Sequence, residues 1–132
     1  MIRKLLLFAI AALATLALAA SAEVAMKKPA PPPATVTGEL VDTGCYLEKG
    51  ARGEAHVGCA TKCISGGMPM GVLTADGKLY LVTMNHDNPD PYNKLKEMAG
   101  KTVSVTGVVS TRSGMQGIDV TDVKLAAATP AK

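Results

Sequence analysis

The chain has 132 residues, a formal net charge of +3, and only three tyrosines and one phenylalanine as aromatic residues. This length fits one small domain, and so few aromatic side chains leave little surface for stacking nucleic-acid bases. Arg3 and Lys4 lie in a segment that we expect to be removed, and the rest of the chain has 12 basic and 11 acidic residues. This balance gives no reason to expect a nucleic-acid partner.

Residues 1–22 are predicted to form a signal peptide. Two basic residues precede an apolar run from Leu5 to Ala20, and Ala20-Ser21-Ala22 offers small residues for cleavage before Glu23. No later segment has the roughly 18 apolar residues that a membrane span requires. We therefore expect a periplasmic or secreted protein with no stable membrane span after cleavage. The alternative is an uncleaved N-terminal anchor.

Three further segments follow the signal peptide. Residues 23–34 contain four prolines and are predicted to form an extended linker. A single domain is expected over residues 35–125, and a flexible tail over residues 126–132. A domain of about 90 residues buries a modest core, so a disulfide or a metal ion would help to stabilise it.

Five short strands are predicted from alternating or β-branched residues between turn signals such as Asp76-Gly77 and Ser113-Gly114. They are Thr35–Val41, Met70–Thr74, Lys78–Met84, Lys101–Ser110 and Gly117–Lys124. A short helix opened by Asp90 or Pro91 and stopped by Gly100 is expected between the third and fourth strands. Within the fourth strand, Gly107 is expected to mark a bend or bulge.

This order of elements predicts a mainly β fold. Five strands with one helix between the third and fourth fit a small, OB-like, partly open barrel. A second helix, which carries cysteine and histidine residues, is inserted after the first strand.

The inserted helix, expected over Gly53–Ser65, is the most informative part of the chain. At 100° per residue, His56, Cys59 and Cys63 fall within an arc of about 60° and are expected to project from one face. Apolar residues beside that arc support a helix packed on the barrel, and Gly66-Gly67 are expected to end it. These apolar residues are Val57, Ala60 and Ile64.

Cys45 is expected to complete a metal site with His56, Cys59 and Cys63. Zn²⁺ binds thiolate and imidazole ligands tetrahedrally, and Cu(I) favours the same soft ligands. A Cys59–Cys63 disulfide is disfavoured, because helical spacing places the two Cβ atoms about 5–6 Å apart whereas a disulfide requires about 3.8 Å. The sequence therefore predicts binding of Cu or Zn.

Two other functions stay open. A disulfide from Cys45 to Cys59 or Cys63 would close a loop of roughly 13–17 residues and contribute about 3 kcal/mol. It would leave one thiol over and make the chain a non-catalytic module that binds a protein, peptide or glycan, such as an envelope partner. Alternatively, His56 lowers the pKa of Cys59 or Cys63 in a thiol redox protein.

Enzymatic hydrolysis has no support, because the chain contains no Ser-His-Asp order, paired-carboxylate signature, P-loop or dinucleotide motif. We therefore expect no enzyme and no catalytic residues.

Four further residues have side chains that could take part in a metal site. Met68 and Met70 carry thioethers that suit Cu(I), although methionine more often fills cores. His86 lies in a polar loop whose composition favours a turn. Asp42 can accept a hydrogen bond from His56 and orient it toward a metal.

The segment from Leu95 to Gly107 resembles the helix-to-fourth-strand passage of bacterial OB-fold domains. Over roughly Thr37 to Val123, the chain is similar to a group of small, exported, uncharacterised bacterial domains with an Asp-x2-Cys…His-x2-Cys-x3-Cys pattern. The matching positions are Gly38, Asp42, Cys45, His56, Cys59, Cys63, Gly67, Leu73, Gly77, Tyr80 and the Gly100–Gly107 stretch. The resemblance implies the OB-like fold and singles out the Cys/His set, and it implies no activity.

The Cys-x3-Cys pair with a histidine is also similar to the copper-binding set of Sco-type proteins. Those proteins are thioredoxin-like, and this chain lacks the alternating strands and helices that such a fold requires. Only the ligand chemistry carries over.

Overall fold

The structure is a computed structural model that describes residues 30–127. The predicted signal peptide, the first part of the linker and the end of the tail lie outside the described residues. In chain order the elements are β1 (Ala34–Asp42), α2 (Thr43–Lys49), the 3₁₀ turn η1 (Glu54–His56), α3 (Val57–Ser65), β2 (Met70–Leu73), β3 (Leu79–Met84), α4 (Asp90–Leu95), the 3₁₀ turn η2 (Lys96–Met98), β4 (Thr102–Arg112) and β5 (Met115–Leu125).

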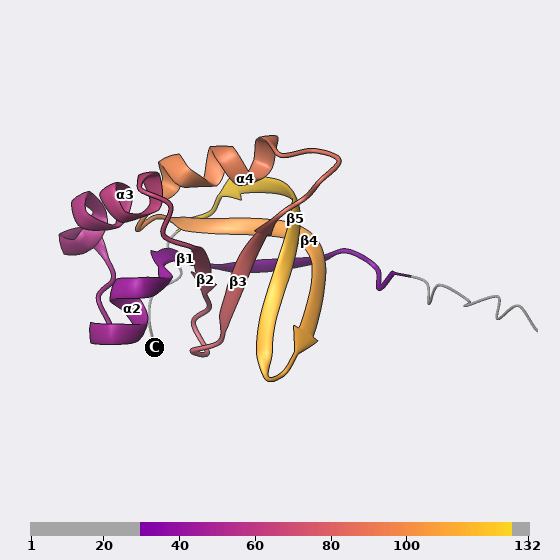
Figure 1. Cartoon of the computed structure of the whole chain (residues 1–132), viewed down its shortest axis with the longest axis horizontal. Coiled ribbons are helices and arrows are strands. Elements are labelled where there is room, and N and C mark those ends of the chain that lie inside the picture. Colours follow the sequence, from indigo (N-terminus) through magenta and orange to yellow (C-terminus); the bar gives the residue numbers. More distant parts are fainter. Residues whose placement is uncertain (1–29, 128–132) are drawn as a thin grey trace, which may run out of the picture.

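The five strands pair into a ring in the order β1-β2-β3-β5-β4, and β4 pairs back onto β1 (Figure 1). Every pair is antiparallel except β3 with β5, which run parallel over the four residue pairs from Leu81 and Gly117 to Met84 and Val120. This arrangement confirms the predicted mainly β, OB-like fold with one helix between the third and fourth strands.

β1 is shared between both sides of the ring. Its first part, up to Glu39, pairs with β4, and its last part, from Glu39 onward, pairs with β2. A Cβ atom on Gly38 would lie 2.2 Å from the carbonyl oxygen of Leu73. Glycine is therefore required where β1 passes from one partner strand to the other.

β4 carries the irregularity that Gly107 predicted. The register with β5 shifts between Thr106 and Gly107, and a Cβ atom on Gly107 would lie 2.1 Å from the carbonyl oxygen of Asp119. The bulge bends the long β4–β5 hairpin so that it can close the ring.

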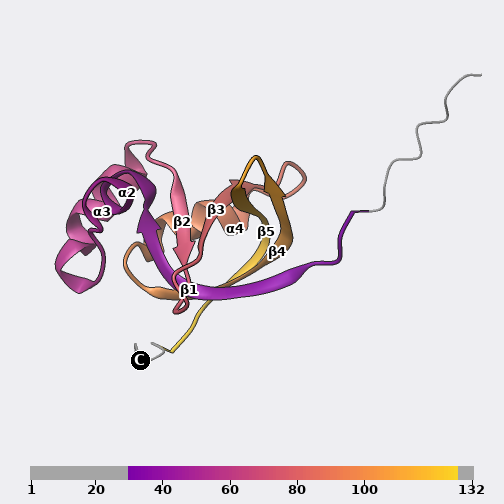
Figure 2. The ribbon, with the colours of Figure 1, turned by 90° about the horizontal axis from the view of Figure 1, so that it is seen from below.

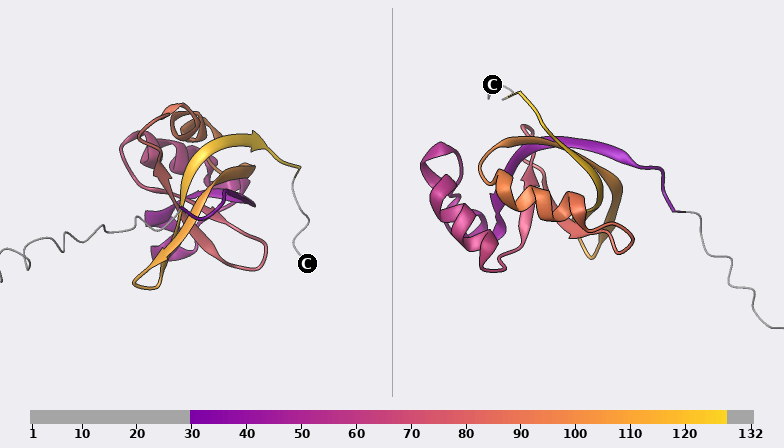
Figure 3. Two further views of the ribbon diagram at one scale, coloured as in Figure 1. Left: turned by 90° about the vertical axis from the view of Figure 1, so that its right-hand side faces the viewer. Right: turned by 90° about the horizontal axis from the view of Figure 1, so that it is seen from above.

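The interior of the ring is filled by apolar side chains from all five strands, with Leu95 of α4 and Ile64 of α3 packed against them. The fully buried members on the strands are Leu40, Met70, Val72, Val103, Val105, Ile118 and Val120. Figure 3 shows α4 lying across the strands, where it contacts β3 and β5. The core is thus built from the ring and covered by one face of α3 and one face of α4.

The segment between β1 and β2 forms a helical insertion, residues 43–69, at one end of the ring (Figures 1 and 2). Its first helix, α2, was not predicted. The expected ligand helix over Gly53–Ser65 is regular only from Val57, because η1 forms its first turn. Among residues 30–127, no helix combines the length and apolar character needed to cross a bilayer.

Candidate metal centre

Asp42, at the end of β1, organises the start of the insertion. Its side chain is fully buried, and its Oδ1 accepts a hydrogen bond of 2.8 Å from the backbone N–H of Cys45. This contact makes Asp42 the N-cap of α2, because a capping carboxylate satisfies an amide that the first helical turn leaves free. Cys45 is thereby fixed on the first turn of α2.

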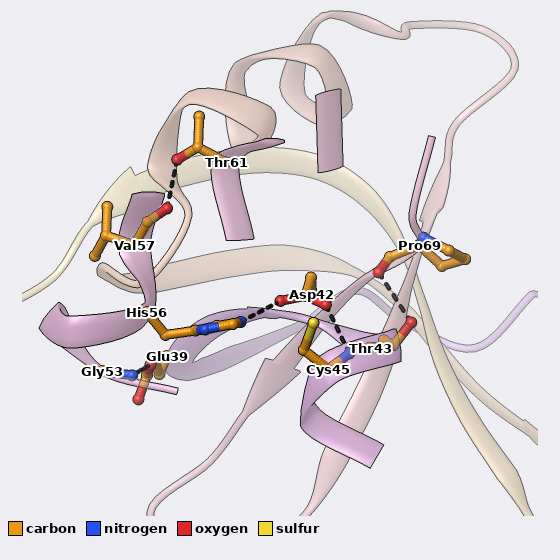
Figure 4. A network of polar contacts seen from close by, with 9 residues as sticks. All are labelled: Glu39, Asp42, Thr43, Cys45, Gly53, His56, Val57, Thr61 and Pro69. Atoms are coloured by element: carbon orange, nitrogen blue, oxygen red, sulfur yellow. Dashed lines mark hydrogen bonds and ion pairs between the residues drawn. The ribbon is translucent and has the colours of Figure 1, made fainter. Parts of the chain in front are cut away.

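The same carboxylate holds His56. The Nε2–H of His56 donates to Oδ2 of Asp42 at 2.9 Å, and Figure 4 shows Asp42 between the imidazole and Cys45. The hydrogen bond that Asp42 was expected to accept from His56 is therefore present. It links β1, α2 and η1 through one buried charge.

Two more polar contacts hold the insertion in place. The carboxylate of Glu39 on β1 accepts a hydrogen bond from the backbone N–H of Gly53. The hydroxyl and the backbone N–H of Thr43 both donate to the carbonyl oxygen of Pro69, at 2.9 and 3.0 Å. The first contact ties the middle of the insertion to β1, and the second ties its two ends together (Figure 4).

The three cysteine sulfurs converge. Cys45 lies on α2, whereas Cys59 and Cys63 lie one turn apart on α3, and the three Sγ atoms are all within 4.8 Å of one another. All three are free thiols, with Cys59 exposed and the other two partly buried. Three soft donor atoms at this separation lie close enough to hold a metal ion.

A second group shares Cys45 with the first. It consists of Asp42, Cys45 and His56, whose ligand atoms also lie within 4.8 Å of one another. His56 does not belong to the thiol group. It ends η1 and directly precedes Val57, the first residue of α3. The four predicted ligand residues therefore meet at Cys45 as two overlapping groups.

His56 can bind a metal through either ring nitrogen. Nδ1 is available while Nε2 keeps its bond to Asp42, which is the usual arrangement of a histidine ligand with a carboxylate behind it. Ligation through Nε2 would require His56 to leave Asp42.

The thiol pKa values reflect the crowding of acidic groups. A hydrogen bond with the Asp42 carboxylate, together with burial, raises the pKa of Cys45 to about 12. Burial and the neighbouring Cys59 also raise the pKa of Cys63. Burial opposes the ionisation of Asp42, but hydrogen bonds from the Cys45 backbone and from His56 outweigh it, so the pKa of Asp42 is lowered.

These pKa directions bear on the chemistry of the site. The redox hypothesis requires a lowered thiol pKa, and for Cys63 the direction is the opposite. A bound cation favours the thiolate form and displaces the proton. Because the pKa values of Cys45 and Cys63 are raised, a cation has to displace their protons, and binding should strengthen as the pH rises.

Met70 and His86 were two other residues considered as possible metal ligands. Met70 is fully buried in the core, so its role is packing. His86 is exposed in the loop between β3 and α4 and belongs to neither group of metal-ligating residues found among the described residues.

Two features were not predicted: the place of Asp42 in a possible metal-ligating group, and α2 as the element that carries Cys45. Asp42 and Gly50 could have revealed α2, because an N-capping aspartate and a left-handed glycine bracket a helix.

Compared with protein-family models, with curated proteins and with solved structures, the chain matches none of them. The resemblance to small exported bacterial domains therefore stays a prediction.

Proposed function

We propose that the protein is an exported domain that binds one soft or borderline transition metal ion, Cu(I) or Zn²⁺. Cys45, Cys59 and Cys63 are its primary ligands, and His56, held by Asp42, is available for a further position. The observation that carries the proposal is the convergence of three free thiol sulfurs within 4.8 Å.

Sequence distance makes this convergence informative. Between Cys45 and Cys59 the chain turns at Gly50, is bound to Glu39 through Gly53, and passes through the 3₁₀ turn η1. These features determine how α2 and α3 approach each other. Burial of Cys59 in the apolar core does not explain its place there, because its side chain is exposed. An exposed thiol beside two others is better explained by ligand chemistry than by packing.

The direct test is titration of the reduced protein with Cu(I) or Zn²⁺ against a competing chromophoric chelator, without oxygen. We expect about one ion per chain, because a closed site is formed by three thiolates and one further donor. The control is the triple variant Cys45→Ser, Cys59→Ser, Cys63→Ser. If the wild type holds neither ion more tightly than this variant, the metal function is wrong.

A matched pair of single variants locates the site. Cys59→Ser removes one of the converging sulfurs, whereas His86→Ala removes an exposed imidazole elsewhere. Cys59→Ser should weaken binding strongly and His86→Ala should leave it unchanged. Equal losses would place the bound ion elsewhere.

Export is the second part of the proposal and rests on the sequence of residues 1–22. N-terminal sequencing of the protein recovered from the periplasm or medium should begin at Glu23. A chain that begins at Met1 would indicate an N-terminal anchor instead.

A disulfide-stapled binding module is the second candidate function. A groove of about 650 Å³ lies beside the insertion, lined among others by Tyr46, Arg52 and Asp76. Its mixed polar and apolar lining suits a peptide or a glycan. This function predicts two oxidised cysteines in protein taken from its native compartment, and the metal function predicts three reduced ones with a stoichiometric ion. Intact mass with and without alkylation, combined with elemental analysis, separates the two.

A further inference from the structure

The end of α3 returns the chain toward the thiol group. The backbone N–H of Gly67 donates to the carbonyl of Ile64 at 3.1 Å, and that of Met68 donates to the carbonyl of Cys63 at 2.9 Å. With Gly67 at a φ of +102°, these two bonds form a Schellman motif. The backbone of Met68 is therefore tied to Cys63.

The side chain of Met68 lies against the other helix. A Cβ atom on Gly44 would be 2.7 Å from both Sδ and Cε of Met68, so the thioether packs on the first turn of α2. Gly44 directly precedes Cys45 in the chain. Met68 thus bridges the two helix turns that carry Cys45 and Cys63.

Met68 does not belong to the buried apolar core. Met68 is 37% exposed, in contrast to Met70, which is fully buried. The residue between them is clamped to α2, because Thr43 donates two hydrogen bonds to the carbonyl of Pro69. A flexible, partly exposed side chain is thus held on a rigid backbone, against the residue that precedes Cys45.

We propose that the Met68 thioether is a further ligand of the thiol site and that it selects Cu(I) over Zn²⁺. This inference rests on the metal-binding function proposed above. Thioether sulfur is a good ligand for Cu(I), whereas protein ligands of Zn²⁺ are thiolate, imidazole and carboxylate. A site of three cysteines and one methionine therefore distinguishes the two ions, which the thiols alone do not.

The first experiment compares Met68→Leu with the matched control Met115→Leu. Leucine nearly preserves the volume of methionine, and Met115 is exposed on β5, far along the chain from the site. Cu(I) and Zn²⁺ affinities of the reduced full chain are measured by chelator competition. Met68→Leu should weaken Cu(I) binding by at least about tenfold, as loss of even an outer-shell partner does, and leave Zn²⁺ binding unchanged. Met115→Leu should change neither affinity.

X-ray absorption of the Cu(I)-loaded protein provides a structural measurement. The number of sulfur neighbours should fall by one in Met68→Leu and stay constant in Met115→Leu. A constant number in Met68→Leu, an unchanged Cu(I) affinity, or an equal loss of Cu(I) and Zn²⁺ affinity would each overturn the role of Met68.

Gly44→Ala tests the same contact from the other side. The added Cβ displaces the thioether, which is the end of a flexible side chain, while alanine is a better helix former than glycine by about 1 kcal/mol. We expect weaker Cu(I) binding without loss of folding stability. In the double variant Gly44→Ala, Met68→Leu the losses should not add, because both act on one contact. Additive losses would contradict the proposal.

The two proposals fail in different ways. If the wild type binds neither ion more tightly than the triple cysteine variant, both are wrong. If the wild type binds Cu(I) and Met68→Leu binds it equally well, the thiol site stands and only the methionine ligand is wrong.

Discussion

The ring of strands and the helical insertion are stabilised in different ways. The ring buries whole rows of apolar side chains, among them Val72, Val103 and Val105. In the insertion, α2 buries only Thr43 and α3 buries only Ala60 and Ile64. Apolar burial contributes about 25 cal/mol per Å², so it accounts for the ring far better than for the insertion.

Polar contacts replace the missing apolar surface in the insertion. Asp42 caps α2 and binds His56, Glu39 binds Gly53, and Thr43 binds Pro69. Single hydrogen bonds contribute about 0.5–1.5 kcal/mol each, so the insertion should open at a lower free energy than the ring. A metal ion or a disulfide at the three thiols would reduce that difference.

The largest expected effect is on the ring. Leu40→Ala should lower the free energy of unfolding by about 2–5 kcal/mol, because it leaves a cavity where a fully buried side chain touched the core. Denaturant unfolding of the reduced, metal-free protein measures it. The control Ser110→Ala, at an exposed position of β4, should change the value by less than about 0.5 kcal/mol. Similar values for the two variants would show that the ring does not determine global stability.

Oxidation should act on the insertion. In metal-free, air-exposed protein, we expect Cys45 to pair with Cys59 or Cys63 and one thiol to stay free, since the two residues on α3 are spaced for a helix. The bond should contribute about 3 kcal/mol and slow amide exchange in α2 and α3 more than in the strands. Peptide mapping identifies the pair. A Cys59–Cys63 bond would mean that α3 is not a regular helix in solution.

Asp42 offers a smaller and more local test. Asp42→Ala removes the cap of α2 and the partner of His56, and should cost about 1–3 kcal/mol. Asp42→Asn keeps a side-chain oxygen for the Cys45 amide and is an equally good cap, so it should cost less. Amide exchange of Cys45 and neighbouring residues measures the difference. Equal losses in the two variants would show that the charge, and not the cap, holds the insertion.

The sequence predicted the ring well because its signals are local and repeated. Alternation in Lys101–Ser110, the turn at Asp76-Gly77 and the glycine at position 107 each correspond to an observed feature. These features agree with one another, which is what makes a small β fold recognisable from sequence.

The site was predicted only in part, because its geometry depends on contacts between segments. The helical periodicity placed Cys59 and Cys63 correctly on one helix. It extended that helix back to Gly53, although residues Glu54–His56 form a 3₁₀ turn. The approach of Cys45 depends on a short helix of seven residues, too short for periodicity to detect. The place of Met68 depends on the Schellman turn and on the absence of a side chain at Gly44.

The smallest expected effect tests the claim that polar contacts, and not apolar burial, hold α2. Leu47 is 72% exposed on α2, and lysine has nearly the same helix propensity as leucine. Leu47→Lys should therefore change the free energy of unfolding by less than about 0.5 kcal/mol. Truncation of the buried Leu40 in the ring, in contrast, should lower it by about 2–5 kcal/mol. Denaturant unfolding and amide exchange of α2 measure it. A loss above about 1 kcal/mol would show that Leu47 packs on a surface in solution, and the contrast between an apolar ring and a polar insertion would then fail at α2.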